Sequence, residues 1–169
     1  GQAIARIAQA GLESRIISGD RDAVVAGVAA DLGISGHGRV SPQNKLAELE
    51  RLKSAGYLPL MVGDGLNDGP ALAAAHVSIA PGTASDASQQ AADAVFIGDK
   101  LMPVALAVVA AKRTMRVVRQ NFGFAIAYNV FAIPLALTGM VTPLIAAVAM
   151  SAGSLVVVGN SLRLAGAAR

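Results

Sequence analysis

The 169-residue chain contains no cysteine and no tryptophan, and aromatic residues make up only 4% of it. The lack of cysteine excludes a disulfide framework and a thiolate metal site within this sequence. Apolar residues nevertheless account for 54% of the chain, and its mean hydropathy is +0.55, which is high for a soluble protein. The length leaves room for one domain and an appendage.

Acidic residues are missing from the second part of the chain. Residues 100–169 hold seven basic and no acidic side chains, whereas residues 1–99 hold seven basic and eleven acidic ones, a net charge of −4. The basic character of the whole chain, with an isoelectric point near 9.7, therefore comes from its second part. A basic flank beside an apolar segment points to a membrane surface, so we expect a membrane partner and no nucleic acid.

Charge of either sign is missing between Arg119 and Arg163. One membrane span takes roughly 20 apolar residues, so this interval fits two short or tilted helices. Gly139 and Pro143 mark the turn, and we expect spans over 121–137 and 144–162. Basic residues flank both outer ends, so the positive-inside rule predicts that both ends of the hairpin are cytoplasmic. A hairpin packed inside a globular protein is the alternative, although an uncharged pair with no polar face argues against it.

Residues 1–99 alternate between helical and extended patterns. The expected helices lie near residues 2–10, 22–32, 42–55, 70–75 and 86–92, and the expected strands at 15–18, 57–62, 77–80 and 94–97. We interpret residues 33–38 as a loop and residues 39–40 as a short pairing segment. Strands that alternate with helices predict a parallel sheet, and thus an α/β Rossmann-like domain that lacks its beginning.

The strand expected over 57–62 leads into the loop GDGLNDGPAL, which carries Asp64, Asn67 and Asp68. In open α/β folds the carboxyl edge of the sheet is where sites form. The glycines allow the backbone to double back, and the proline suits the first turn of a helix. Two carboxylates and an amide on one short loop favour a hard cation such as Mg²⁺. An Asp/Asn/Gly turn without a metal is the alternative.

This string resembles the GDGxNDxPAL signature of P-type ATPases, ion pumps whose phosphorylation domain is of the haloacid-dehalogenase type. The resemblance implies that Asp64 and Asp68 belong to the Mg²⁺ site of the phosphorylation centre and that Asn67 supports the same centre. It implies Mg²⁺ and ATP as cofactors, with ATP held by a nucleotide domain that this sequence does not contain.

Two further elements resemble the same family. Ser18-Gly19-Asp20 stands where the family has its TGD element, with Ser in place of Thr, and the resemblance implies that the Ser18 hydroxyl hydrogen-bonds phosphoryl oxygens. Lys45 stands where the family has a lysine that offsets phosphate charge. Taken alone, Ser18 is an ordinary turn residue and Lys45 a solvated helix residue.

The uncharged interval carries Tyr128-Asn129 in its first helix and Met150-Ser151 in its second. Polar groups at such depth are costly unless they hydrogen-bond or bind something, and contact between helices is one such use. These pairs resemble the last two membrane helices of heavy-metal-transporting P-type ATPases, copper pumps in particular, in which they line the intramembrane metal site. Gly153 departs from copper pumps, which often have serine there. A thioether favours Cu(I).

The family's phosphorylated aspartate lies in a DKTGT motif, and the one Asp-Lys pair here, Asp99-Lys100, does not continue that motif. We therefore expect the C-terminal part of an inner-membrane heavy-metal pump, inactive without its missing N-terminal portion. The expected parts are residues 1–99 of the phosphorylation domain, a basic stalk helix over 100–120, and a transmembrane hairpin with a short tail over 121–169. A non-catalytic membrane-anchored remnant or regulatory piece, and a soluble phosphatase of the same fold, are the alternatives.

Overall fold

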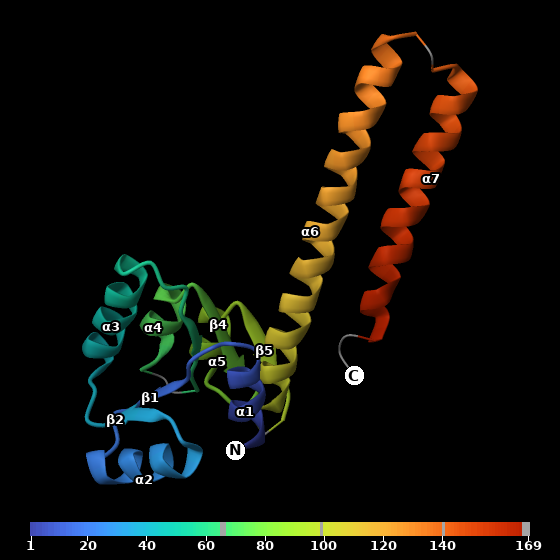
Figure 1. The fold of residues 1–169 in the computed structure, drawn as a ribbon. Helices are drawn as coiled ribbons and strands as arrows, with labels where there is room; N and C mark the ends of the chain where they lie inside the picture. The colour runs from blue at the N-terminus through green and yellow to red at the C-terminus, as the bar shows by residue number, and fades with distance from the viewer. Residues whose placement is uncertain (65–66, 99, 140, 167–169) are drawn as a thin grey trace. The chain divides into compact units, whose positions relative to one another are not determined.

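The computed structural model describes residues 1–64, 67–98, 100–139 and 141–166. The chain divides into two compact units, Gly1–Ala105 and Leu106–Arg169. The first unit is an α/β structure with parallel strands, and the second is helical and turns back on itself as a hairpin (Figure 1). The expected fold class, a parallel α/β unit followed by two long apolar helices, is confirmed.

The elements follow one another in the alternating order that the sequence predicts. The helices of the first unit are α1 (Gln2–Gln9), α2 (Asp22–Leu32), α3 (Pro42–Ser54), α4 (Gly69–Ala74) and α5 (Asp86–Ala91). Its strands are β1 (Arg15–Ile17), β2 (Ser35–His37), β3 (Leu60–Val62), β4 (Val77–Pro81) and β5 (Ala94–Phe96). The hairpin consists of α6 (Met102–Leu137), α7 (Pro143–Leu162) and a final 3₁₀ turn, η1 (Arg163–Gly166).

The strands form two parallel sheets. In one, β1 pairs with β2, with Ile16 opposite Gly36. In the other, β4 lies between β3 and β5, with Met61 opposite Ser78 and Ala80 opposite Val95. In the described residues, β1 and β3 each have a strand neighbour on one side only.

The interpretation of residues 33–38 as a loop was wrong for residues 35–37, which form β2. Residues 39–40 form no strand, but their backbone amides pair with the segment after β1: the Val40 amide donates to the Ser18 carbonyl at 2.9 Å and the Arg39 amide to the Asp20 carbonyl at 2.6 Å. The signal is hidden because α2 packs tightly on β2: a Cβ on Gly36 would lie 2.8 Å from the Ala29 Cβ, so this strand cannot show an apolar pattern there. Arg39 adopts a left-handed conformation with φ +49°, which ends any extended run.

Small and β-branched side chains dominate the core of the first unit. Leu72, Ala80 and Val104 are each at most 2% exposed. Ser78 is equally buried, and Asp93 satisfies it: the Asp93 carboxylate accepts from the Ser78 amide at 2.8 Å and from its hydroxyl at 3.0 Å. This pair fixes the approach to β5 against β4, as buried polar groups require.

The second unit is built on two helices that are long and apolar enough to cross a membrane. The α6 helix has 36 residues and includes an 18-residue stretch with mean hydropathy 1.3, and the helix from Pro143 to Ala165 has 23 residues and includes one with mean hydropathy 1.7. The stalk and the first span expected from the sequence are thus parts of one continuous helix. Pro134 lies inside α6, a position tolerated in membrane helices.

Candidate phosphorylation-site half and intramembrane residues

An ion pair joins α3 to the start of α4. Ser41 caps α3 by accepting a hydrogen bond from the Asn44 amide at 3.2 Å, and Lys45 follows in the first turn. The Lys45 Nζ lies 2.7 Å from the Asp68 Oδ1, and the two side chains are only 15% and 11% exposed. At this burial each charge depends on the other, because a buried charge without a partner is strongly destabilising.

Gly63 makes room for this pair at the end of β3. A Cβ on Gly63 would lie 3.1 Å from both the Cβ and the Oδ2 of Asp68, closer than most side chains approach. Asp68 is therefore held between Lys45 on one side and the Gly63 backbone on the other. The neighbouring Asp64 and Asn67 side chains are exposed. One carboxylate of this loop is thus fixed by the fold, while the other faces outward at the end of a strand.

Ser18 and Asp20 form a hydrogen-bonded turn directly after β1. The Ser18 hydroxyl donates to the Asp20 Oδ2 at 2.8 Å, and the Asp20 amide donates back to the Ser18 Oγ at 3.2 Å. Gly38 closes the turn from the other side, because a Cβ there would lie 2.7 to 2.8 Å from the backbone of Asp20 and Asp22. The backbone around Ser18-Gly19-Asp20 is therefore tightly determined, whereas Gly19 itself has room for a side chain.

A second ionic cluster ties β1 to α3. The Glu48 carboxylate accepts from the Arg15 Nη1 at 2.9 Å and from the Arg51 Nε at 2.7 Å. The hydrogen bonding from Arg51 lowers the pKa of Glu48 below its usual value, with the nearby charges of Arg51 and Arg15 adding to the shift. Since α3 also holds Lys45, this cluster helps to orient the helix that positions Asp68.

The residues of the loop suit Mg²⁺ only in part. Asp64 offers an exposed carboxylate, the ligand type that Mg²⁺ prefers, while one Asp68 oxygen is already paired with Lys45. Over the described ranges, no group of three or more His, Asp or Glu side chains could hold a metal by itself. A Mg²⁺ ion at Asp64 would thus take its other ligands from water, a phosphoryl group or groups outside these ranges.

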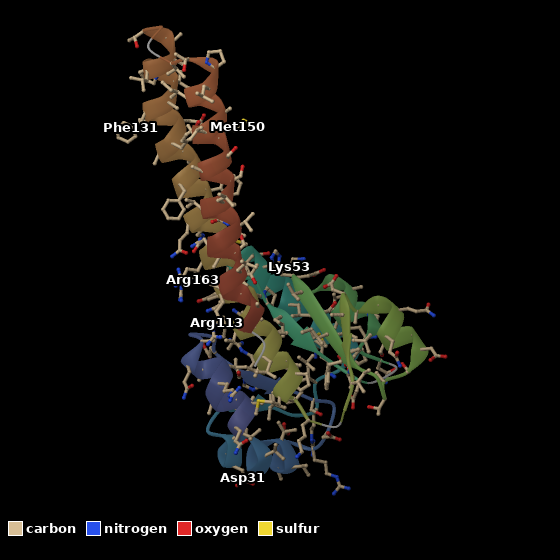
Figure 2. The ribbon with its side chains drawn as sticks, turned by 90° about the vertical axis from the view of Figure 1, so that its right-hand side faces the viewer. Asp31, Lys53, Arg113, Phe131, Met150 and Arg163 are labelled. Atoms are coloured by element: carbon tan, nitrogen blue, oxygen red, sulfur yellow. The ribbon has the colours of Figure 1, made fainter. Side chains whose placement is uncertain are left out.

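The four intramembrane candidates all lie on the exposed surface of the hairpin. Tyr128 is 41% and Met150 69% exposed, and Asn129 and Ser151 are exposed as well. The Asn129 amide nitrogen donates to the Ala125 carbonyl oxygen of its own helix at 2.8 Å. Figure 2 shows Met150 on α7 at the same level along the hairpin as Phe131 on α6. All four side chains therefore remain accessible at the surface of the hairpin and are not buried between α6 and α7.

Known proteins resemble both units. Residues 1–76 match the family described as haloacid dehalogenase-like hydrolase. "Nitrogen fixation protein FixI" of Rhizobium leguminosarum bv. viciae is 55% identical over 98% of this chain and 22% of its own length. "Cation-transporting P-type ATPase B" of Mycobacterium tuberculosis (strain ATCC 25618 / H37Rv) is 42% identical over 96% of this chain and 22% of its own.

Homologues of this chain are cation-transporting P-type ATPases, which match it over nearly its whole length. A solved zinc-transporting PIB-type ATPase in its E2.Pi state superposes with a TM-score of 0.83 at 28% identity, over 96% of this chain and 27% of the other. The α/β unit is thus of the haloacid-dehalogenase type. The chain spans about a fifth of the length of the curated relatives that it matches.

The site analysis from sequence missed two sets of residues. Ser78, in the strand expected at 77–80, and Asp93, just before the strand expected at 94–97, hold β4 to the segment before β5, and no motif marks either residue. Asn121, Asn160 and Ser161 hydrogen-bond across the base of the hairpin. Their position, at the two ends of the uncharged interval beside Arg119 and Arg163, is the sequence signal that could have revealed them.

Proposed function

We propose that this chain is the C-terminal part of an ATP-driven heavy-metal pump of the inner membrane that transports Cu(I). In this account the α/β unit supplies the Mg²⁺-binding half of the phosphorylation site. The hairpin supplies the last two membrane helices. The observation that carries the proposal is the buried Lys45–Asp68 pair beside the exposed Asp64, in a chain that continues into two apolar helices.

In the proposed phosphorylation site, some side chains hold the loop in place and others are exposed and available to Mg²⁺ and the phosphoryl group. Asp64 contributes a carboxylate to Mg²⁺, which shields the charge of a phosphoryl group when it is bound. Asp68, held by Lys45 and Gly63, keeps the backbone of the loop in place, and Asn67 supports the same loop. Ser18, in its turn with Asp20, offers a hydroxyl to phosphoryl oxygens, and Lys45 adds positive charge nearby.

The phosphorylated aspartate must come from the missing N-terminal portion in this account. The strands β1 and β3 each lie at an edge of their sheet in the described part of the chain, as do β2 and β5, so a parallel strand from that portion can pair with both β1 and β3. A strand between them would bring its carboxyl end next to the residues that follow β1 and β3, namely Ser18 and Asp64. The nucleotide domain that holds ATP belongs to the same portion, so we expect this chain alone to form no phosphoenzyme.

The hairpin favours a pump over a soluble phosphatase of the same fold. In the most apolar stretch of each of its two helices, 0% of the residues are buried within the structure. These side chains therefore need lipid or other membrane helices around them. Tyr128, Asn129, Met150 and Ser151 lie on this exposed surface and can face the remaining helices of the pump. Met150 is the proposed direct Cu(I) ligand, because Cu(I) prefers soft thioether and thiolate donors.

Replacing Asp64 in the complete pump tests the proposed phosphorylation site. Asp64→Ala should lower acid-stable labelling from γ-labelled ATP by on the order of 100-fold or more, because the electrostatic shield of the phosphoryl group is lost. Asp31→Ala, which removes an exposed carboxylate at the end of α2, is the matched control and should label normally. Near-normal labelling of Asp64→Ala would refute the assigned role.

A further inference from the structure

Polar side chains at the base of the hairpin form a directional chain of hydrogen bonds. The Arg163 Nη1 donates to the Asn160 Oδ1 at 3.2 Å, and the Asn160 Nδ2 donates to the Asn121 Oδ1 at 2.9 Å. The Asn121 Nδ2 donates in turn to the Ser161 Oγ at 3.1 Å, and that hydroxyl donates to the Val157 carbonyl oxygen at 2.8 Å. The three middle side chains each donate and accept, an arrangement in which neighbouring hydrogen bonds strengthen one another.

These hydrogen bonds cross between α6 and α7 twice. The Asn160 side chain makes a third crossing, to the Gln120 Oε1 at 3.3 Å. Asn121, Asn160 and Ser161 are all half-buried. We call these three residues the base cluster. Figure 2 shows the adjacent Arg163 at the end of the hairpin away from the turn.

Two deeper polar side chains, those of Asn129 and Ser154, form hydrogen bonds within their own helices. The Asn129 Nδ2 bonds to the Ala125 carbonyl, and the Ser154 hydroxyl donates to the Met150 carbonyl at 3.1 Å. In the described residues between 120 and 163, the side-chain hydrogen bonds that cross between the helices are those of the base cluster. Hydrogen bonds that could fix the alignment of α6 and α7 in this region are therefore those of the base cluster.

The rest of the contact face cannot fix the alignment well. On α7 the half-buried positions above the base are Ala149, Gly153 and Val157, one every four residues, and on α6 Ala132 is half-buried. Small side chains at these positions allow the backbones to approach closely. Because they recur every four residues, α7 presents a similar face after a shift of about one turn. A slip by one helical turn, about 5.4 Å, would instead break the three hydrogen bonds of the base cluster that cross between the helices.

We propose that the base cluster consists of positioning residues that fix the register of α6 against α7. It thereby holds Asn129 and Met150 at nearly one depth in the membrane. Asn129 lies eight residues from Asn121, and Met150 lies ten residues from Asn160. Those separations correspond to about 12 and 15 Å along the two helices. The second part of the proposal rests on the proposed metal site.

Cysteine cross-linking in the complete pump measures the register without any need for turnover. Ala132 and Ala149 each lie eleven residues from the base, counted from Asn121 and Asn160, and both are half-buried. With all other cysteines replaced, the Ala132→Cys/Ala149→Cys pair should react with a short bifunctional thiol reagent about tenfold faster than Ala132→Cys/Gly153→Cys. The latter pair is the matched control, because it is offset by about one turn on the same face.

Asn160→Leu removes the central member of the cluster while keeping its size. Because one interhelical hydrogen bond shifts such an equilibrium by roughly three- to twentyfold, the two cross-linking rates should then come within about threefold of each other. A second test leaves Asn160 in place. Asn121→Ser alone and Ser161→Asn alone should each bring the two cross-linking rates closer together. The double change keeps an amide–hydroxyl pair across the helices and should restore the original ratio of the two rates. An unchanged ratio in Asn160→Leu, or no rescue by the double change, would overturn the register role.

Metal activation tests the second part in a pump that retains its own cysteines. Asn160→Leu should raise the Cu(I) concentration for half-maximal ATPase stimulation by about tenfold and leave the KM for ATP unchanged. A register shift with unchanged Cu(I) activation would overturn the link to Met150 and leave the register role standing. If the unaltered pump shows no Cu(I) stimulation while cross-linking responds as expected, the proposed function fails and the register role is supported.

Discussion

A single ion pair shows how individual residues shape the candidate phosphorylation site. Lys45 and Asp68 come from different helices, are both largely buried, and meet at 2.7 Å. Asp68 reaches this position because Gly63 has no side chain to block it. The exposed Asp64, one residue after Gly63, is therefore presented by a loop whose two ends are fixed, at the end of β3 and at the start of α4.

Breaking this pair should destabilise the loop and α4. Lys45→Met removes the ammonium group that lies 2.7 Å from the largely buried Asp68 carboxylate, at a cost of about 3 kcal/mol, so amide hydrogen exchange in α4 should accelerate about 100-fold. Lys53→Met is the matched control, since the Lys53 Nζ also reaches α4, at the Ala74 carbonyl, but from an exposed position. Its effect on exchange should be less than about fivefold.

The double variant Lys45→Met/Asp68→Leu separates pairing from packing. Removing both charges should recover much of the protection that Lys45→Met loses, because no uncompensated charge stays buried. Exchange in α4 that is as fast in the double variant as in Lys45→Met would argue that Lys45 acts through its aliphatic stem and not through the ion pair.

At the scale of single elements, close packing of α2 on β2 explains the main error in the interpretation of the sequence. Strands 77–80 and 94–97 were recognisable because most of their residues are β-branched or apolar and turns bound them. Residues 35–37 are Ser-Gly-His and carry no such pattern. Their strand exists because Gly36 lets the Ala29 and Val25 side chains lie directly on the backbone, a tertiary contact that no local pattern encodes.

A methyl group at Gly36 should disturb this contact. In Gly36→Ala the new Cβ would lie 2.8 Å from the Ala29 Cβ and 3.0 Å from a Val25 methyl, so α2 must shift, at a cost of about 1–3 kcal/mol. Gly27→Ala is the control within α2, because a Cβ there meets nothing within 4 Å. That change should stabilise the helix by up to about 1 kcal/mol.

Thermal unfolding of the two glycine variants gives opposite expected shifts, downward for Gly36→Ala and upward or unchanged for Gly27→Ala. Equal destabilisation by both would mean that flexibility of α2, and not its close approach to β2, is what the glycines provide.

In the candidate site, too, some residues are recognisable from sequence motifs, whereas others are identified only by their contacts in the folded structure. The exposed carboxylate at Asp64 and the hydroxyl at Ser18 were found because each follows a strand within a recognisable motif. The pairing of Lys45 with Asp68 could not be read from the sequence, since the two residues lie 23 positions apart and meet only when α3 packs on α4. The base cluster of the hairpin joins residues about 40 positions apart and was missed for the same reason.

At the scale of the whole molecule, the uneven charge predicts how the hairpin is inserted. The uncharged interval is flanked by Arg119 and Arg163, and the turn between the helices carries no basic residue. The positive-inside rule predicts that both outer ends face the cytoplasm, where ATP would be available to the α/β unit.

Accessibility of introduced cysteines tests this topology in right-side-out membrane vesicles of the complete pump. A cysteine at Val141, in the turn, should react with an impermeant thiol reagent. Cysteines at Ala110 and Ala165 should be protected until the membrane is permeabilised. Protection of only one of these two positions would refute a hairpin with two crossings.

Metal-dependent phosphorylation of the complete pump tests the central claim most directly, because it joins the α/β unit to the hairpin in one measurement. Cu(I) should stimulate acid-stable labelling from γ-labelled ATP in the unaltered protein more strongly than Zn²⁺ does. Met150→Leu, which keeps volume and apolarity and should fold normally, should weaken the Cu(I) response by about tenfold or more, because the thioether ligand is lost. Stimulation by Zn²⁺ alone, or an unchanged Cu(I) response in Met150→Leu, would contradict the account.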